Sequence, residues 1–185
     1  LEQRTGEGDL SYVRDLQEDV EVLSGLTTEL LTFARSELKR EKVELHPVGL
    51  RRVVEQAVQV EAPEGVMVDV DAEITVEADE GLLFRAISNL VRNAVQYGEI
   101  DISVTGRREG DGVVLVVADR GPGVPEEALE KIFTPFFRLD LARDRKKGGT
   151  GLGLAMVRNY VEMCGGRVVA RNRAGGGLEQ VVTLR

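Results

Sequence analysis

The sequence is poor in the side chains that form disulfides and histidine-rich metal sites. Among its 185 residues it has one cysteine, Cys164, and one histidine, His46. A single cysteine excludes an internal disulfide framework and is typical of a reducing compartment. A single histidine excludes a metal site built from several imidazoles. These two absences remove disulfide scaffolds and multi-histidine metal sites from consideration.

The chain also lacks an excess of positive charge and any long apolar run. It has 24 basic and 32 acidic residues, a formal net charge of −8 and a pI near 4.9. This balance argues against general binding to nucleic acid or to an anionic membrane surface. No apolar stretch is long enough for a signal peptide or a membrane span. Because the first residue is Leu1, we expect the chain to be part of a longer protein.

The segment from Leu10 to about Lys42 is predicted to form one long helix. Between Leu10 and Lys42 there is no proline and only one glycine, and apolar or small residues recur at alternating spacings of three and four. That spacing is typical of the a/d seam of a helical bundle. Docking on the chain's own domain is one interpretation, but a seam of about four heptads favours half of a helical hairpin that dimerises. The seam consists of Val13, Leu16, Val20, Leu23, Thr27, Leu30 and Ala34.

A second region, residues 44–185, begins at Glu44-Leu45-His46-Pro47, where Pro47 ends the helical pattern. Its helical and alternating segments predict a two-layer α/β sandwich with a mixed sheet of about five strands and three helices, an α+β fold. Helices are expected over 50–60, 79–97 with Asp79 as its cap, and 152–163. Strands are expected over 66–71, 74–78, 100–105, 113–118, 167–171 and 180–184.

Three segments of this region carry polar or glycine-rich patterns. Asn89 and Asn93 lie at i and i+4 on one helical face, where amide oxygens suit Mg²⁺ but are also common on a solvated surface. Asp119 begins Asp-Arg-Gly-Pro-Gly after an apolar strand, which suits either a hydrogen bond to an exocyclic amine or an ordinary turn. The Gly148–Leu154 run precedes a helix, a pattern that favours phosphate binding.

The chain around the glycine run has two further features. Residues 138–147 hold five basic and two acidic side chains, a local excess that suits an anionic ligand or a solvated mobile loop. The preceding Phe133-Thr-Pro-Phe-Phe137 contains three of the five phenylalanines, which suits core packing or the anchor of a lid. The glycine run is neither G-x-G-x-x-G nor a P-loop.

In this order the segments resemble the sensor histidine kinases of two-component signalling. The run Asn89–Tyr97 looks like the family's N box, Asp119–Gly123 like its first glycine box, Phe133–Arg138 like its F box and Gly149–Leu154 like its second glycine box. The segment 30–35 is similar to the second helix of the dimerisation and phosphotransfer hairpin. The resemblance covers most of the chain after Pro47.

The resemblance implies a Bergerat-type fold that binds ATP and Mg²⁺. Asp119 would hold the adenine amino group, Asn93 with Asn89 would reach the metal and the phosphates, and Arg138 would contact the γ-phosphate. The catalytic set is thus Asn89, Asn93 and Arg138, and the metal set is Asn93 and Asn89. The wider nucleotide-binding set is Asn89, Asn93, Gln96, Tyr97, Asp119, Gly121, Gly123, Phe133, Arg138, Lys147, Gly149, Thr150, Gly151, Leu152 and Gly153.

Two positions depart from the family pattern. Gln96 stands where the family often has lysine or arginine, and Leu178 follows the third glycine run, 175–177, where a threonine or small residue is common. A nucleotide-binding or dimerisation module without kinase activity is therefore one alternative. A Bergerat ATPase is another, although related ATPases usually carry glutamate as general base where Asn89 stands.

The resemblance also implies what surrounds such a chain. Residues 1–43 would be part of the dimerisation and histidine phosphotransfer region, and 44–185 the catalytic ATP-binding domain. A histidine on the first hairpin helix, outside this chain, would take the phosphate and pass it to an aspartate of a response regulator. His46 is expected to be a solvated linker residue, so the chain should bind ATP without autophosphorylating. The parent is expected to be a dimeric, membrane-anchored bacterial sensor with this part in the cytoplasm and no nucleic-acid partner.

Overall fold

The computed structural model describes residues 20, 23–25, 27–28, 30–31, 34, 43–62, 64–98, 101–139 and 150–185. The chain forms two compact units, residues 1–35 and 36–185. In the first unit every described residue is helical, and the hydroxyl of Thr27 donates to the carbonyl oxygen of Leu23 at 2.8 Å. Val20, Leu23 and Leu30 of the predicted seam are exposed. The other seam positions, apart from Thr27 and Ala34, lie outside the described residues.

The second unit is built on a five-stranded mixed sheet with the strand order β2-β4-β5-β7-β6. The pair β2 and β4 is parallel, whereas β4–β5, β5–β7 and β6–β7 are antiparallel. This sheet confirms the predicted mixed sheet of five strands. Its strands are β2 Val66–Val70, β4 Ile102–Glu109, β5 Gly112–Ala118, β6 Arg167–Asn172 and β7 Leu178–Leu184.

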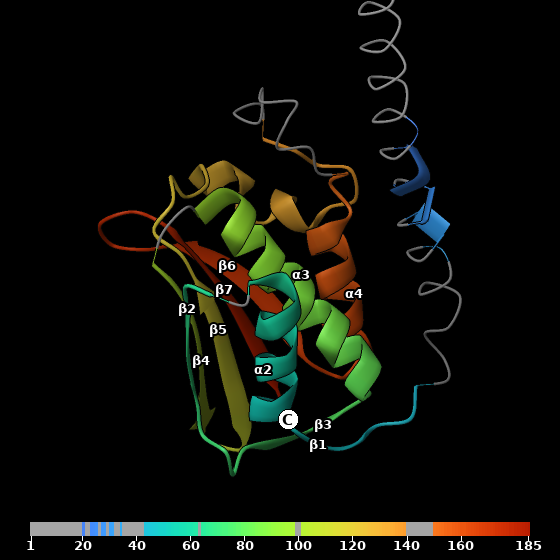
Figure 1. Ribbon diagram of the computed structural model, residues 1–185, viewed down its shortest axis with the longest axis vertical. Coiled ribbons are helices and arrows are strands. Elements are labelled where there is room, and N and C mark those ends of the chain that lie inside the picture. The colour runs from blue at the N-terminus through green and yellow to red at the C-terminus, as the bar shows by residue number, and fades with distance from the viewer. Residues whose placement is uncertain are drawn as a thin grey trace, which may run out of the picture. The chain divides into compact units, whose positions relative to one another are not determined.

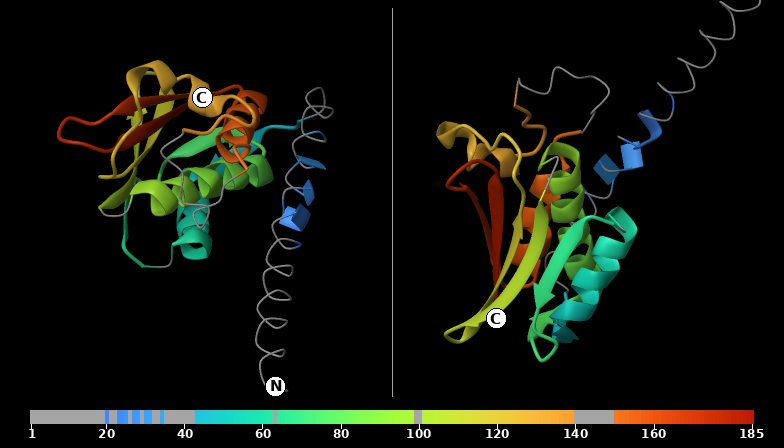
Figure 2. Two further views of the ribbon diagram at one scale, coloured as in Figure 1. Left: turned by 90° about the horizontal axis from the view of Figure 1, so that it is seen from above. Right: turned by 60° about the vertical axis from the view of Figure 1, so that its left-hand side comes forward.

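Three helices cover one face of the sheet and complete the predicted two-layer sandwich (Figures 1 and 2). They are α2 Leu50–Glu61, α3 Glu80–Gly98 and α4 Gly153–Met163, and α3 packs against both of the others. Along β5, Val113, Leu115 and Val117 are buried while the residues between them are partly exposed. This alternation places the core between the sheet and the helical layer.

The start of α3 follows the predicted capping. The backbone N–H of Leu82 donates to Oδ1 of Asp79 at 2.9 Å, which satisfies one of the free donors of the first helical turn. At its other end the helix extends to Gly98, one residue beyond the prediction. Capping therefore fixes where the helix that carries both asparagines begins.

A second, two-stranded sheet was not predicted from the sequence. Strand β1, His46–Gly49, pairs antiparallel with β3, Thr75–Ala78, with Cα partners His46 and Ala78. The expectation that His46 lies in a linker was therefore wrong, because the residue begins a strand. Its side chain is nevertheless solvated, as expected, at 70% exposure. A four-residue strand that contains Pro47 gives little local signal, because proline removes a ladder donor and is confined to edges or strand starts.

Two short 3₁₀ helices, also not predicted, follow β5. They are η1 Glu126–Ala128 and η2 Lys131–Phe133, and η2 packs against α4. Isolated turns of three residues have no apolar periodicity that a sequence pattern could reveal. In the part of the chain that the structure describes, no helix is both long and apolar enough to cross a membrane.

Candidate functional site

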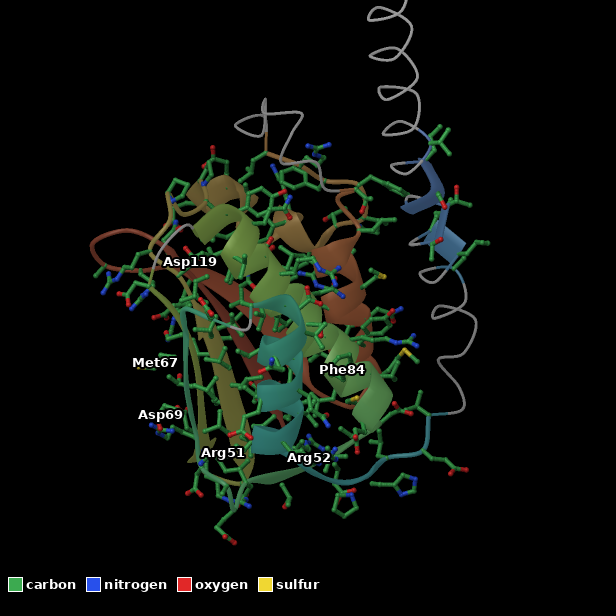
Figure 3. The ribbon with its side chains drawn as sticks, viewed as in Figure 1. Arg51, Arg52, Met67, Asp69, Phe84 and Asp119 are labelled. Atoms are coloured by element: carbon green, nitrogen blue, oxygen red, sulfur yellow. The ribbon has the colours of Figure 1, made fainter. Side chains whose placement is uncertain are left out.

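Asp119 is a buried carboxylate directly after the last residue of β5. Its side chain is 5% exposed, and its Oδ1 accepts from the backbone N–H of Gly121 at 2.8 Å and of Leu178 at 3.3 Å. Both contacts use the same oxygen, which leaves Oδ2 available as an acceptor. These hydrogen bonds therefore hold the carboxylate in a fixed orientation, and Figure 3 shows it near the other end of the sheet from Arg51 and Arg52.

Two glycines allow the end of α3 to approach Asp119. A Cβ atom on Gly98 would lie 2.3 Å from Cβ of Asp119, and one on Gly121 would lie 2.5 Å from the carbonyl oxygen of Tyr97. Neither distance is compatible with a real side chain. The first glycine box is thus packed against the last turn of α3, and the helix that carries the asparagines ends beside the carboxylate.

The third glycine run, residues 175–177, and the residues on either side of it contact the backbone and the carboxylate of Asp119. Gly177 has φ +103°, and a Cβ atom there would lie 2.1 Å from the carbonyl oxygen of Asp119. Nη1 of Arg173 donates to that same oxygen at 2.8 Å. The neighbouring Leu178 contacts Asp119 through its backbone N–H and carbonyl, the latter accepting from the Asp119 N–H at 3.0 Å. The departure from threonine at Leu178 therefore does not alter these backbone contacts.

Asn172 fixes the loop after Gly123 and was not singled out from the sequence. Its Oδ1 accepts from the N–H of Val124 at 2.9 Å, and its Nδ2 donates to the carbonyl of Val124 at 2.7 Å and to Oε1 of Glu126 at 3.0 Å. A Cβ on Gly123, whose φ is +72°, would lie 2.7 Å from the same Oδ1. A lone asparagine at a strand end gives no local signal of this role, because its partner is 48 residues away.

Asn89 and Asn93 lie on α3 as predicted. Nδ2 of Asn89 donates to the carbonyl of Arg85 at 2.9 Å, which leaves its Oδ1 free to bind a ligand. A Cβ on Gly153, the first residue of α4, would lie 3.5 Å from this Oδ1. Asn93 is half-buried one turn further along the helix. The end of the second glycine box, where α4 begins, therefore lies beside the first asparagine.

The predicted site residues that lie on α3 connect the two ends of the candidate site. Asn89 lies beside the start of α4, and Gly98 lies against Asp119. At 1.5 Å per residue these positions are roughly 13 Å apart along the helix axis. Between them are Asn93, the half-buried Gln96 and Tyr97, which is 36% exposed. The arrangement suits an elongated ligand with a hydrogen-bonding head at Asp119 and an anionic tail at Asn89.

The two ends of the predicted lid are joined by their backbones. The N–H of Phe136 donates to the carbonyl of Gly151 at 3.0 Å, and both residues have positive φ, +64° and +75°. A Cβ on Gly151 would lie 2.8 Å from the carbonyl carbon of Phe136. Oγ1 of Thr150 accepts from the N–H of Leu152 at 3.1 Å. Of the other predicted lid residues, Arg138 is exposed, while Lys147 and Gly149 lie outside the described residues.

Phe133 is buried against α4. It is 2% exposed, and the guanidinium of Arg158 lies 5.0 Å from the centre of its ring. This is the distance of a cation–π contact. Phe133 therefore anchors η2 to the helix that follows the lid.

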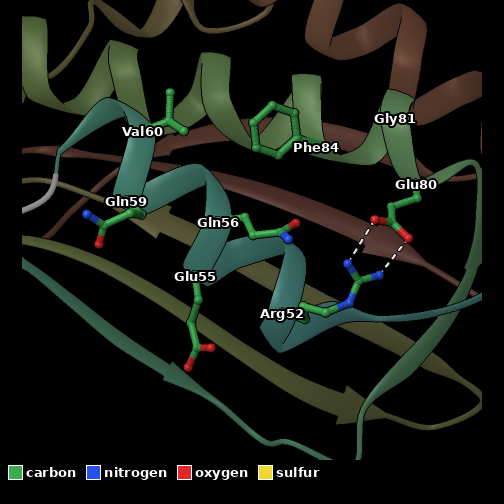
Figure 4. A pocket seen from close by; sticks show the side chains of 8 residues that line it. All are labelled: Arg52, Glu55, Gln56, Gln59, Val60, Glu80, Gly81 and Phe84. Carbon is green, nitrogen blue, oxygen red and sulfur yellow. Dashed lines mark hydrogen bonds and ion pairs between the residues drawn. The ribbon is translucent and has the colours of Figure 1, made fainter.

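A separate groove of about 790 Å³ lies between α2 and the start of α3 (Figure 4). Across it Arg52 donates two hydrogen bonds to the carboxylate of Glu80, which lower the pKa of Glu80 and raise that of Arg52. None of the predicted site residues lines this groove. Its lining residues are Arg52, Glu55, Gln56, Gln59, Val60, Glu80, Gly81 and Phe84.

Comparison with known sequence families gives one match to this region. The profile described as "Histidine kinase-, DNA gyrase B-, and HSP90-like ATPase" matches residues 78–185. The sensor histidine kinase CpxA of Escherichia coli is 46% identical over 99 residues, which are 54% of this chain and 22% of CpxA. The sensor-like histidine kinase SenX3 of Mycolicibacterium smegmatis is 34% identical over 163 residues, 84% of this chain and 42% of SenX3. The chain thus spans about a fifth to two fifths of these relatives.

Solved structures show the same fold. Full-length ShkA in complex with AMPPNP superposes with a TM-score of 0.77 at 31% identity, covering 94% of this chain and 38% of ShkA. The nucleotide-free catalytic domain of the histidine kinase ThkA superposes with a TM-score of 0.64 at 26% identity, covering 76% of this chain and 97% of that domain.

Proposed function

The chain belongs to the histidine kinase-, DNA gyrase B- and HSP90-like ATPase family, and on that premise we propose that it is the ATP-binding catalytic part of a sensor histidine kinase. In this role it would transfer the γ-phosphate of ATP to a histidine of a dimerisation domain, from which a response-regulator aspartate would receive it. The observation that carries the proposal is that Asp119 lies beside the last turn of α3, while Asn89, near the middle of the same helix, lies beside the start of α4.

The base of ATP would bind at Asp119. Its Oδ1 is held by two backbone N–H groups, so Oδ2 can accept a hydrogen bond from the exocyclic amine of adenine. Gly98 and Gly121 let the last turn of α3 pack closely against the carboxylate. Tyr97, exposed at the end of α3, would pack beside the base.

The phosphates and Mg²⁺ would bind where α3 and α4 meet. Among the described residues no three His, Cys, Asp or Glu side chains are grouped so that they could hold a metal ion. The side-chain oxygens of Asn89 and Asn93 fit a magnesium ion that takes its other ligands from phosphates and water. Bound there, the metal would neutralise phosphate charge. The backbone around Gly151 and Gly153, at the N-terminus of α4, would donate to phosphate oxygens, with Arg138, Lys147 and Gly149 on the lid.

The phosphate acceptor would come from elsewhere than His46. This histidine begins β1, is paired with Ala78, and lies 3.9 Å from the Glu44 carboxylate rather than on a helix. In the proposed reaction an imidazole is itself the nucleophile, so no general base is needed at the position of Asn89. An amide cannot take a proton at neutral pH, which disfavours a hydrolytic ATPase.

The organisation of the whole protein follows from the same proposal. Residues 1–43 would contribute to a dimerisation and phosphotransfer region and 44–185 would form the catalytic domain. The parent would be a homodimer that acts on a response regulator and is anchored in a bacterial inner membrane with this part in the cytoplasm. The exposed Val20, Leu23 and Leu30 support a helix that packs against partner helices.

Calorimetric titration with a non-hydrolysable ATP analogue and Mg²⁺ tests the nucleotide site. We expect saturable binding that Asp119→Asn weakens at least tenfold, because the amide presents donors as well as an acceptor to the adenine amine. Absence of binding at millimolar nucleotide would overturn the proposal. Binding without phosphoryl transfer to a histidine-bearing dimerisation domain supplied in trans would instead favour a nucleotide-binding module.

Incubation with radiolabelled ATP tests the acceptor. We expect no acid-labile phosphate on the 185-residue chain. Label that disappears in His46→Ala would contradict this. Steady phosphate release that is lost in Asn89→Ala would favour the ATPase.

A further inference from the structure

Gln180 is a buried side chain whose amide group has no hydrogen-bond partner within the part of the chain that the structure describes. It lies in β7 and is 1% exposed, and neither Nε2 nor Oε1 forms a hydrogen bond with the described residues. Leaving a buried amide unpaired is destabilising, so such groups in native structures need an explanation. An apolar side chain of the same size would fill the position without this penalty. The amide therefore points to a ligand that supplies it with a hydrogen-bond partner.

The register of the sheet places Gln180 beside the candidate base site. Along β7, Leu178, Gln180, Val182 and Leu184 are all buried, so their side chains face the helical layer. Gln180 pairs with Val117 of β5 on one side and with Ala170 of β6 on the other.

Asp119 is two residues beyond Val117 and therefore on the same face of the sheet. It is also tied by hydrogen bonds to Leu178, which precedes Gln180 by two residues. Gln180 thus lies one row of the sheet further inward than the carboxylate. Diagonal neighbours on one face of an antiparallel pair are within reach of long side chains.

We propose that Gln180 is a second residue that reads the adenine base, acting with Asp119 through one buried water. Nε2 of Gln180 donates to the water, and the water donates to ring nitrogen N1, next to the exocyclic amine that Asp119 accepts. Because Gln180 lies one row of the sheet further inward than Asp119, a water bridges the distance between its amide and the base. Such a bridge is nearly as favourable as a direct hydrogen bond. This inference rests on the proposed ATP site.

Ser88 provides a matched comparison within the same chain. Like the amide of Gln180, the Oγ atom of Ser88 is buried and has no hydrogen-bond partner among the described residues. Ser88 is 5% exposed. On α3 it lies one turn from Phe84 and from Arg92, and Arg92 bonds Glu61 of α2. Ser88 is therefore on the side of α3 that faces α2, away from Asp119.

An ATP analogue with C–H in place of ring atom N1 tests the proposal on the unaltered chain. We expect the analogue to bind about threefold to tenfold more weakly than ATP, the effect of one lost hydrogen bond. Equal affinity for the two nucleotides would overturn the role of Gln180. If the chain binds neither nucleotide at millimolar concentration, the proposed function itself fails.

The variant Gln180→Met, with Gln180→Leu as a second apolar replacement, tests the residue. We expect Gln180→Met to bind ATP as weakly as the unaltered chain binds the analogue, to bind the analogue with unchanged affinity, and to melt at a higher temperature because the unpaired amide is gone. Ser88→Ala should melt at a higher temperature and keep the affinity for ATP. Wild-type affinity for ATP in a folded Gln180 variant would contradict the proposal while leaving the ATP site intact.

Discussion

Gly177 lies against the backbone of Asp119 so closely that a Cβ atom on Gly177 would be 2.1 Å from the Asp119 carbonyl oxygen. The two residues are 58 positions apart in the sequence, yet this contact and the hydrogen bonds to Leu178 fix the carboxylate in place. The third glycine run is therefore part of the candidate base site. Its role is to leave room for the backbone of Asp119, which a side chain at Gly177 would displace.

Gly177→Ala should destabilise the chain and weaken ATP binding. The neighbouring Gly176 is a matched control, since its φ is +100° against +103° but a Cβ there would meet its nearest atom only at 3.7 Å. Gly176→Ala should cost about 1–2 kcal/mol from backbone strain alone, and Gly177→Ala about 1–3 kcal/mol more from the clash. Urea denaturation and nucleotide titration measure both effects. Equal stability of the two variants would show that the close contact has no energetic consequence.

Asn172→Ala should loosen the loop that carries Gly123. The substitution removes both hydrogen bonds to Val124 and leaves the Val124 N–H and carbonyl without this partner. We expect a loss of about 1–3 kcal/mol in the free energy of unfolding, with weaker ATP binding. The neighbouring Arg171→Ala, which breaks only an exposed ion pair with Glu179, is the control and should have little effect. Wild-type stability and affinity in Asn172→Ala would refute the positioning role.

The contact between Phe133 and Arg158 can be measured by a double-mutant cycle. Phe133→Leu keeps an apolar side chain in a site that is 2% exposed, and Arg158→Met keeps the length of the side chain without its charge. We expect a coupling energy of about 0.5–1 kcal/mol from unfolding free energies. Strict additivity of the two substitutions would indicate that the 5.0 Å approach contributes no cation–π stabilisation.

The stability of the chain should fall at alkaline pH because of Cys164. Burial raises the pKa of its thiol above the ordinary value. The folded state then keeps a proton that the unfolded state releases, so stability is complete below the unfolded pKa of about 8.5 and decreases as pH rises past it.

Melting temperatures at about pH 7 and about pH 9.5 test this dependence on the thiol pKa. Between the two pH values the melting temperature of the wild type should fall by more than that of Cys164→Ala, because the variant has no thiol to ionise. A loss of the same size in both proteins would assign the pH effect to other groups.

The elements that position the site could be predicted from sequence because their signals are local. The i and i+4 spacing of Asn89 and Asn93 requires only a helix, and Asp79 caps that helix through a residue three positions away. Asp119 follows an alternating strand whose apolar residues mark the core face. Each of these patterns lies within one turn or one strand.

The tertiary structure decided everything that depends on strand pairing and close approach. It made β1 from a proline-containing segment, placed Gly177 and Asn172 around the Asp119 loop, and put the buried Gln180 one row from the carboxylate. Local sequence patterns predicted the three helices and the five strands of the large sheet, but neither β1 nor the two 3₁₀ helices. Which side chains of these elements meet was decided by the register of the sheet, because a residue's partners across a ladder lie far away in the chain.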